Sequence, residues 1–255
     1  MYNQELRPQK ELILCEDGSN TLFSKEFNEP YHSTKDGALH ESLEKHVKPA
    51  FGIKKEQESL TILDICFGLG YNTFATLYYI KEKNLTTKVH ILSPEFDEGL
   101  VRSLSTFIFP PEFDFLKPIM QAISKNLFYE DEQFKIEILL GDARESVPQI
   151  KEKIDIVYQD AFSPAHNPLL WTREFFRDMA NISKTDTILT TYSTAASVRL
   201  GLYENGFFIF IHRAELMRYS TVASMKMLES FEYVDMELKK ERNPTAQSFK
   251  DEGFE

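Results

Sequence analysis

The sequence predicts an α/β fold: a seven-stranded, mostly parallel Rossmann-like sheet with helices on both faces and a small N-terminal elaboration. From about residue 60 onward, short apolar runs alternate with longer amphipathic stretches, which is the pattern of βαβ units. A glycine turn, Gly68-Leu69-Gly70, separates the first apolar run from the first amphipathic stretch. Acidic residues follow several of the apolar runs, where parallel strands would end at a common edge.

Seven apolar runs have the length and composition of strands, and helical periodicity fits the segments between most of them. The predicted strands are 60–66, 88–93, 134–140, 154–160, 186–192, 207–212 and 220–227. The predicted helices are 72–83, 98–107, 144–151, 171–183 and 195–205, the last ended by Gly206. Because no helical pattern separates the last two strands, we expect them to pair as an antiparallel hairpin at one edge of the sheet.

The chain divides into residues 1–55, an elaboration with a hairpin and a helix, residues 56–231, the main domain, and residues 232–255, a polar tail. In the elaboration, 11–15 and 21–24 flank a turn at Asp17-Gly18-Ser19-Asn20, and 39–47 has helical periodicity. The proline-containing segment 107–117 predicts an irregular insertion, and the tail is expected to fray.

Composition indicates a soluble folded protein, with 42% hydrophobic and 27% charged residues among 255. The net charge of −11 argues against non-specific coating of nucleic acid, so a nucleic-acid partner would have to meet a local patch. Cys15 and Cys66 lack metal-ligand spacing, and we expect structural roles for both and no metal. The polar start at residues 1–5 and the lack of a long apolar run predict a cytoplasmic protein without a membrane partner.

The glycine turn predicts a nucleotide site, because Gly68 and Gly70 let the backbone approach a ligand at a helix N-terminus. A dinucleotide fingerprint would need a third glycine at position 73, and Thr73 stands there, which disfavours a nicotinamide cofactor. A purely structural tight turn is the alternative.

Two acidic residues after later strands extend this nucleotide hypothesis. Glu95 lies about 25 residues beyond the glycines, where a carboxylate accepts both ribose hydroxyls, and Asp97 competes for that role. Asp142 follows the third strand and is placed for an adenine amino group, although Asp is also a common helix cap. We favour ligand contact, because glycine and acidic features at three successive strand ends are harder to explain separately than together.

The fourth strand ends at Asp160, which opens the loop Ala161-Phe162-Ser163-Pro164-Ala165-His166-Asn167-Pro168. A carboxylate before a proline-stiffened loop is well placed to face a substrate, and a loop cap is the alternative. We assign His166 to the surface and Trp171 to packing of the following helix.

These residues resemble the methyltransferase-domain family, in its stand-alone form, of the bacterial bifunctional tRNA 5-methylaminomethyl-2-thiouridine biosynthesis protein. The most specific segment is Asp160-Ala-Phe-Ser-Pro-Ala-His-Asn-Pro-Leu-Leu-Trp171. Further matching segments are Phe67-Gly68-Leu-Gly70-Tyr-Asn72, Ser93-Pro-Glu95, Gly141-Asp142-Ala-Arg144, Thr191-Tyr192-Ser193-Thr-Ala-Ala-Ser-Val198-Arg199 and Gly206-Phe207. In the N-terminal region, Asp17-Gly18-Ser19, Tyr31-His32-Ser33, Gly37-Ala38 and Glu41-Ser42 also match.

The resemblance implies a class I methyltransferase fold and S-adenosylmethionine as cofactor. It implies methyl transfer to the exocyclic amine of 5-aminomethyl(-2-thio)uridine at the tRNA wobble position. It places Asn72, Tyr31 and Glu41 in the cofactor pocket, and Phe162 and Pro164 against the substrate. The flavin oxidoreductase half of the bifunctional protein has no counterpart in this sequence, so no flavin is expected.

Methylation of an amine requires a free nitrogen lone pair, and Asp160 is the residue expected to orient the ammonium and accept or relay its proton. The family's basic run near the last strand is reduced here to Met217-Arg218-Tyr219. Residues 199–226 nevertheless carry an excess of basic over acidic side chains, which predicts a phosphate-facing patch of Arg199, Arg213 and Arg218. An ordinary mixed surface is the alternative. The alternatives are an N-methyltransferase acting on a small amine or a protein, which the acidic charge suits, and a non-catalytic partner subunit.

Overall fold

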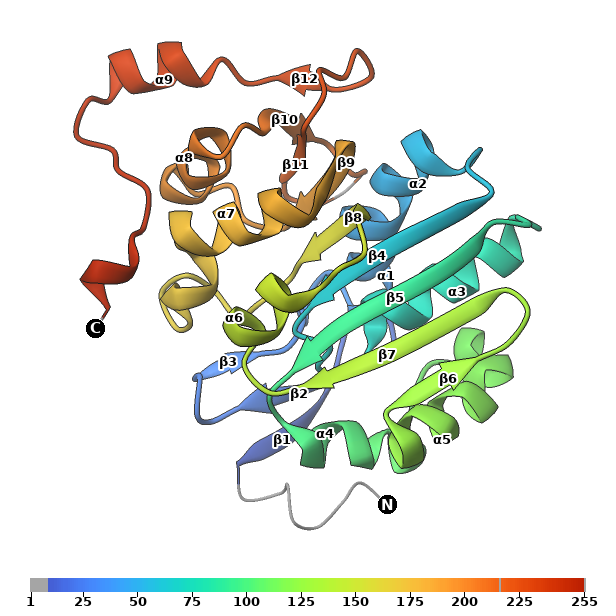
Figure 1. Cartoon of the computed structure of the whole chain (residues 1–255). Helices are drawn as coiled ribbons and strands as arrows, with labels where there is room; N and C mark the ends of the chain where they lie inside the picture. The colour runs from blue at the N-terminus through green and yellow to red at the C-terminus, as the bar shows by residue number, and fades with distance from the viewer. Residues whose placement is uncertain (1–8, 216, 255) are drawn as a thin grey trace.

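The computed structural model of the chain describes residues 9–215 and 217–254; the start of the predicted elaboration, including the polar segment 1–5, lies outside them. Its centre is a nine-stranded sheet in the order β12-β10-β11-β9-β8-β4-β5-β7-β6 (Figure 1). The seven predicted strands correspond to β4 (Ser59–Ile65), β5 (Lys88–Glu95), β7 (Phe134–Leu140), β8 (Ile154–Gln159), β9 (Ser183–Thr191), β10 (Phe208–His212) and β11 (Ser220–Ser224).

Strands β7, β5, β4, β8 and β9 are parallel, and β11 is antiparallel to both β9 and β10. This arrangement confirms the mostly parallel Rossmann-like sheet and the predicted hairpin of β10 with β11. The two strands that were not predicted, β6 (Phe128–Glu130) and β12 (Glu232–Tyr233), are three and two residues long. Such short strands show no alternation that a sequence pattern could reveal.

Helices cover both faces of the sheet (Figure 1). One face carries α3 (Tyr71–Glu82), α4 (Glu98–Ser103) and α5 (Lys117–Asn126), and the other carries α6 (Ala143–Ser146), α7 (Arg173–Ile182) and α8 (Ala196–Glu204). A hydrophobic core lies on each face of the sheet, and side chains of successive strand residues point to opposite faces. In β4, Ile62 packs on the first face, while Leu63 and Ile65 pack on the second. A strand buried on both faces reads as a continuous apolar run, which explains why the sequence marked these strands clearly.

The N-terminal region forms a separate small sheet of β1 (Lys10–Leu14), β2 (Asn20–Ser24) and β3 (Glu29–Pro30). It is followed by α1 (Ala38–Glu41), the π-helix η2 (Ser42–Val47) and α2 (Lys48–Lys54). The predicted hairpin and the predicted helix at 39–47 are both present. The helix, however, has the wide π geometry over six residues, which no sequence pattern indicated.

Two expectations about irregular segments differ from the structure. The insertion at 107–117 contains the 3₁₀ helix η4 (Pro111–Leu116), which leads directly into α5. The prediction of a frayed tail is wrong: the tail contains α9 (Met236–Arg242), and Phe249 bridges to Thr172. Specific contacts to the main domain hold this polar segment in place, although its composition suggests solvent exposure. Among the described residues, no helix is both long and apolar enough to cross a bilayer.

Candidate active site

A cavity of about 760 Å³ lies at the carboxyl ends of β4, β5, β7 and β8, beneath the N-terminal hairpin. Parallel strands end together at this edge, and their following loops diverge to opposite faces, so a crevice forms there. Most of the predicted cofactor residues line it: Gly68, Asn72, Glu95, Asp142, Tyr31 and Glu41. Asp160 and Phe162 line it as well.

The glycine turn joins β4 to α3 with left-handed backbone at both glycines. Gly68 has φ +55°, and a Cβ added there would meet the Tyr31 ring at 3.2 Å. Gly70, with φ +75°, precedes α3, and a Cβ there would meet the rings of Phe67 and Phe74 at 2.6 and 2.7 Å. Gly70 is not among the described residues that line the cavity. Its place in the structure is therefore to close the turn, while Gly68 faces the cavity.

Glu95, at the end of β5, is tied to the glycine turn. Its carboxylate accepts the backbone N–H of Gly68 and of Asp97, each at 2.7 Å. Burial raises the pKa of the Glu95 carboxyl, against the lowering effect of these two donors. Asp97, the competing candidate, accepts the N–H of Leu100 as the α4 cap and pairs with Lys10. Both carboxylates line the cavity, and protein donors contact both oxygens of each; those of Glu95 tie it to the glycine turn, and those of Asp97 to α4 and Lys10.

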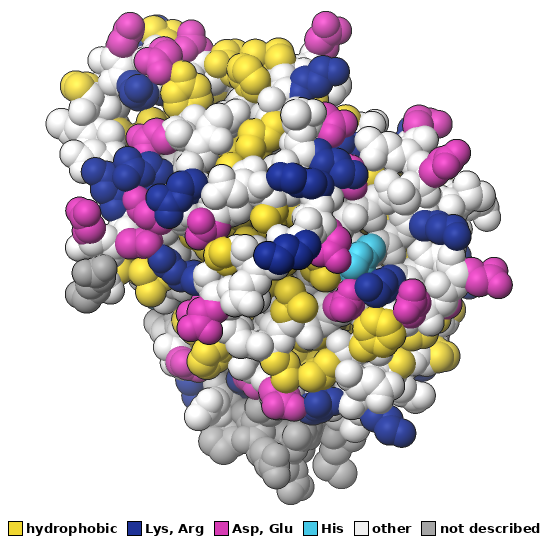
Figure 2. All heavy atoms as spheres, viewed as in Figure 1, with side chains coloured by type: hydrophobic (Ala, Val, Ile, Leu, Met, Phe, Trp, Pro, Cys, Tyr) yellow, Lys and Arg dark blue, Asp and Glu magenta, His cyan; other side chains and the backbone are white. Residues whose placement is uncertain are grey.

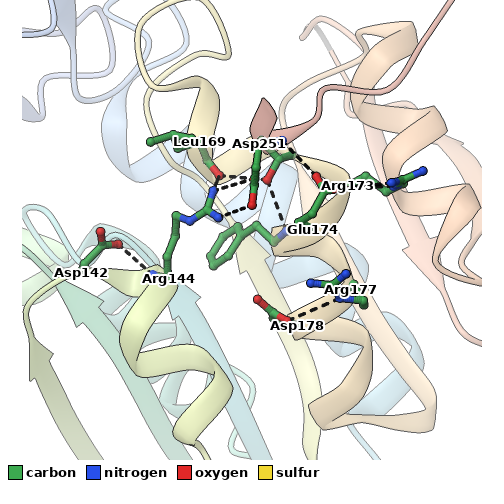
Figure 3. A network of polar contacts seen from close by, with 10 residues as sticks. Asp142, Arg144, Leu169, Arg173, Glu174, Arg177, Asp178 and Asp251 are labelled. Atoms are coloured by element: carbon green, nitrogen blue, oxygen red, sulfur yellow. Dashed lines mark hydrogen bonds and ion pairs between the residues drawn. The ribbon is translucent and has the colours of Figure 1, made fainter. Parts of the chain in front are cut away.

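Asp142 caps α6, accepting the backbone N–H of Arg144 at 2.8 Å, and it also lines the cavity. Asp142 therefore does serve as a helix cap, the alternative role predicted for it, and the cap uses one of its carboxylate oxygens. Beside it, the Arg144 guanidinium donates to the Leu169 carbonyl and to both oxygens of Asp251 (Figure 3). This ion pair fastens the C-terminal tail to the cavity rim.

Asp160 follows β8, with its carboxylate 12% exposed and facing the cavity. Asn72 Nδ2 donates to its Oδ2 at 2.8 Å, and His46 Nε2 lies 3.3 Å from its Oδ1. Burial raises the pKa of Asp160, but the charges of His46 and His32 and the Asn72 hydrogen bond lower it, and the net pKa is below the ordinary value. The structure therefore holds Asp160 as an anion.

Asn72, the second residue of α3, connects two carboxylates, Asp160 and the buried Asp64, the latter at 3.5 Å from its Nδ2. Burial raises the pKa of Asp64 to about 7, and the charge of Asp160 adds to the rise. Asn72 Oδ1 is buried without a hydrogen-bond partner among the described residues. A buried acceptor without a donor is costly, so it marks a place where an amino group of a ligand would fit.

The loop after Asp160 is fixed from two sides. The Trp171 indole donates to the Phe162 carbonyl at 2.7 Å, and the Tyr192 hydroxyl donates to the Ala161 carbonyl at 2.9 Å. Trp171 is fully buried, in keeping with the packing role predicted for it. Pro164 is absent from the described cavity wall, so it shapes the loop without facing the cavity.

The N-terminal hairpin contributes the roof of the cavity. Phe162 stacks on Phe27 at 4.5 Å and meets Tyr31 edge-on at 4.8 Å between ring centroids. Glu29 accepts the Ser163 hydroxyl at 2.8 Å and faces His166 Nδ1 at 2.7 Å. The N-terminal region and the Asp160 loop therefore meet through aromatic contacts at Phe162 and polar contacts at Glu29.

Glu41 lies further inside, accepting the Ser33 N–H at 2.7 Å and pairing with the buried Lys45 at 2.8 Å. These contacts keep its carboxylate at the cavity wall.

The sequence analysis assigned no role to several residues of this site: His46, His32, Asp64, Phe27 and Glu29. His46 contacts Thr190 across 144 residues of sequence, and Glu29 contacts Ser163 across 134. Only His32 stood in a matching segment, and nothing assigned it a role.

The three predicted phosphate contacts are not equivalent. Arg199 is half-buried, its Nε donates to Thr221 at 3.0 Å, and burial lowers its pKa. Arg213 is exposed, pairs with Glu232 at 2.6 Å and covers the Tyr219 ring, and Arg218 is exposed. None of the three belongs to the described cavity wall.

Comparisons with known proteins agree with this geometry. Residues 114–225 match the family model described as S-adenosyl-L-methionine-dependent methyltransferase. The crystal structure of MNMC2 from Aquifex aeolicus is 34% identical, with a TM-score of 0.82, over 96% of this chain and 79% of that one.

Two curated relatives are longer than this chain. The tRNA 5-methylaminomethyl-2-thiouridine biosynthesis bifunctional protein MnmC of Pseudomonas entomophila is 29% identical over 75% of this chain, which spans 31% of that protein. An uncharacterized protein of Methanocaldococcus jannaschii is 31% identical over 81% of this chain and 56% of its own length. The chain belongs to the S-adenosyl-L-methionine-dependent methyltransferase family that includes MNMC2 of Aquifex aeolicus and the methyltransferase domain of MnmC.

Proposed function

We propose that this protein transfers a methyl group from S-adenosylmethionine to the exocyclic amine of 5-aminomethyl(-2-thio)uridine at the wobble position of tRNA. The observation that carries the proposal is the Asp160 carboxylate, held as an anion at the cavity wall beside the glycine turn and beneath aromatic rings. An anion among aromatic side chains suits a base that bears an ammonium group. The similarity to MnmC, whose name places it in tRNA 5-methylaminomethyl-2-thiouridine biosynthesis, supports the same substrate class.

The residues of the cavity fit the cofactor. Glu95 would accept the ribose hydroxyls, Asp142 the adenine amino group through its second oxygen, and Asn72 Oδ1 the amino group of the methionine part. Gly68 lets the backbone approach, and Tyr31 and Glu41 complete the wall. When bound, S-adenosylmethionine supplies an electrophilic methyl group on a positively charged sulfur.

The protein's own contribution is to orient the acceptor and to remove its proton. Asp160 pairs with the substrate ammonium, and loss of one proton frees the nitrogen lone pair. The free nitrogen would then take the methyl group that bound S-adenosylmethionine supplies, leaving a neutral thioether, and the product would be a secondary ammonium. The aromatic rings of Phe27, Tyr31 and Phe162 pack together over this part of the cavity.

The site of tRNA contact is proposed at the sheet edge next to the cavity. Because β10 runs parallel to β9, the loop after His212 leaves the sheet at the same edge as Asp160. That loop carries Arg213 and Arg218, which makes them the proposed phosphate contacts. On the face shown in Figure 2, by contrast, basic and acidic side chains are interspersed and form no single basic field.

The test is single-turnover methylation of one tRNA species prepared with and without the 5-aminomethyl group, followed by mass spectrometry of its nucleosides. We expect a gain of one methyl group on the aminomethyl nucleoside and none on the unmodified tRNA. The net charge of −11 favours the competing acceptors, a small amine or a protein. Transfer to free amines with no transfer to the modified tRNA would select that alternative.

A further inference from the structure

His46 lies directly behind Asp160 and is fully buried, although it plays no part in the function proposed above. Its Nε2 is 3.3 Å from Asp160 Oδ1, and its Nδ1 is 3.0 Å from the hydroxyl of Thr190. The residue stands on the π-helix η2 (Ser42–Val47). π-helical turns are rare and occur frequently at functional sites.

The hydrogen bonding of His46 is incomplete on the side of Asp160. Within the described part of the chain, its buried Nε2 makes no hydrogen bond of good geometry. Catalytic hydrogen bonds are commonly long or misaligned before substrate binds. On the other side, the Thr190 hydroxyl can both donate and accept, so it remains a partner for Nδ1 with or without a proton there. The imidazole can therefore change its proton without losing this contact.

The other titratable groups around His46 are committed to partners of their own. The His32 Nδ1 contacts the Thr21 hydroxyl, the Tyr158 hydroxyl contacts Thr76, His212 Nε2 contacts the Glu44 carbonyl, and Asp64 accepts the Thr73 hydroxyl. Glu41, which precedes the same helix, pairs with Lys45 within it. Asp160 is thus the group that faces Nε2 at contact distance.

We infer that His46 and Asp160 work as one acid–base pair, in which His46 takes up through Asp160 the proton that the substrate ammonium loses. The inference rests on the proposed function for the identity of the ammonium. His46 does not touch the substrate, so it is a positioning residue that acts through Asp160.

The proton is accounted for at each stage. The ammonium N–H gives its proton to the Asp160 carboxylate, and Nε2 of His46 accepts it while Nδ1–H is donated to Thr190. The amine is then neutral, Asp160 is again an anion, and His46 is a cation. After the methylated product leaves, the proton returns from His46 through Asp160 to water.

The pKa of Asp160 reflects its pairing with His46. Burial raises the pKa of Asp160, and His46 is the foremost of the groups that lower it. The charge on His46 acts after the transfer, when it keeps Asp160 an anion beside the protonated imidazole. Before the transfer, the Asn72 hydrogen bond and the substrate ammonium stabilise the carboxylate, while the neutral His46 keeps Nε2 free to accept.

The first experiment compares pH profiles of single-turnover methyl transfer in the wild type, His46→Gln and His90→Gln. Glutamine keeps a donor toward Asp160 but cannot accept a proton. His90 is a matched control, because it also pairs with a carboxylate, Glu137 at 2.7 Å, outside the cavity wall. For His46→Gln we expect a loss of about tenfold or more at pH 7 that shrinks as pH rises and the free amine deprotonates. A His46→Gln profile parallel to that of the wild type would overturn the pair.

Thr190→Val is the second variant, since valine has nearly the shape of threonine and suits a buried strand position. Without the hydroxyl, a proton on Nδ1 is unsatisfied, so the imidazole prefers Nε2–H and cannot accept from Asp160. We expect the same pH-dependent loss as in His46→Gln, with a smaller magnitude. A pH-independent loss in this variant contradicts the relay.

A measurement without substrate separates this inference from the proposed function. Carbon-13 NMR of the aspartate carboxyls gives the pKa of Asp160 in the wild type and in His46→Gln. We expect the pKa to rise in the variant, and an unchanged titration overturns the pair whatever the substrate is. A wild-type protein that leaves aminomethyl tRNA unmethylated, but whose Asp160 titration depends on His46, contradicts the proposed function and supports the pair.

Discussion

The side-chain amide of Asn72 donates to the carboxylate of Asp160 across 2.8 Å, which links the first residues of α3 to the end of β8. The Oδ1 of the same Asn72 is buried and has no hydrogen-bond partner within residues 9–215 and 217–254. One residue thus joins the two halves of the site: the glycine-turn side proposed to hold the cofactor and the Asp160 side proposed to hold the acceptor.

Replacement of Asn72 by alanine tests this link. Hydrogen bonds to charged groups contribute about 1.5–3 kcal/mol, so kcat should fall roughly 10- to 100-fold at saturating cofactor. Cofactor affinity should weaken in the same variant, since Oδ1 is removed as well. The control is Asn205→Ala, whose amide donates to the Arg173 and Gly201 carbonyls away from the cavity. A loss of melting temperature without a kinetic change is expected there, and equal kinetics in both variants would contradict the link.

Asp160→Asn keeps the size of the side chain and removes its charge. General acid–base contributions are typically 10²–10⁴-fold, so we expect kcat for methyl transfer to fall by about two orders of magnitude or more. Affinity for S-adenosylmethionine, measured by calorimetry, should change little. Asp178→Asn on α7 is the matched control, because Asp178 pairs with Arg177 outside the cavity wall. Near-normal turnover in a folded Asp160→Asn protein would move the search to Tyr192 or His32.

The sequence pattern predicted those parts of the site that are local in the chain. The turn at Gly68, the carboxylates Glu95 and Asp142 and the loop after Asp160 all sit at strand ends, and strand ends are readable from apolar runs. The sheet order places these ends at one edge, so their convergence could also be expected.

The remaining part of the site depends on tertiary packing. His46 stands on a π-helical turn and lies 3.3 Å from Asp160, and neither the turn nor the distant partner Thr190 leaves a local pattern. The half-burial of Arg199 likewise follows from its hydrogen bond to Thr221, which pairs in the sheet next to β9. By charge alone, Arg199 and Arg218 are equally good candidates for a phosphate contact. Their different exposure to solvent, which follows from packing, distinguishes them.

Asp64 predicts a pH dependence of stability. Burial raises its pKa from 3.8 to about 7, so the folded protein holds this proton more tightly than the unfolded chain does. The resulting stabilisation is complete below about pH 4 and is lost as pH rises through about 7. Asp64→Asn is neutral at all pH values and lacks this dependence. The wild type should therefore lose stability relative to Asp64→Asn between pH 5 and 8, as measured by urea unfolding; a constant difference would contradict the assigned protonation.

Glu95 and Asp97 are separable by substitution. Glu95→Gln removes an acceptor proposed for the ribose, and we expect S-adenosylmethionine and S-adenosylhomocysteine to bind about 10- to 100-fold more weakly in calorimetry. Asp97→Asn should instead act on stability, because Asp97 caps α4 and pairs with Lys10. NAD should bind neither the wild type nor the variants, since Thr73 occupies the third glycine position. If Asp97→Asn weakens S-adenosylmethionine binding and Glu95→Gln does not, Asp97 is the ribose acceptor instead.

The proposed tRNA edge is tested by the salt dependence of binding. Arg213 and Arg218 are exposed on the loop that leaves β10 at the cavity edge, whereas Arg199 is half-buried and bonded to Thr221. The double variant Arg213→Ala/Arg218→Ala should bind tRNA more weakly, with a plot of log affinity against log salt that is flatter by roughly one unit for each lost phosphate contact. S-adenosylmethionine affinity should stay at the wild-type value, because neither residue is among those that line the cavity.

Arg199→Ala is the control variant, and it should lower the melting temperature and leave the salt slope unchanged. An unchanged slope in the double variant, with tRNA methylated normally, would remove this edge as the tRNA surface and direct attention to the exposed residues of the insertion at 107–117.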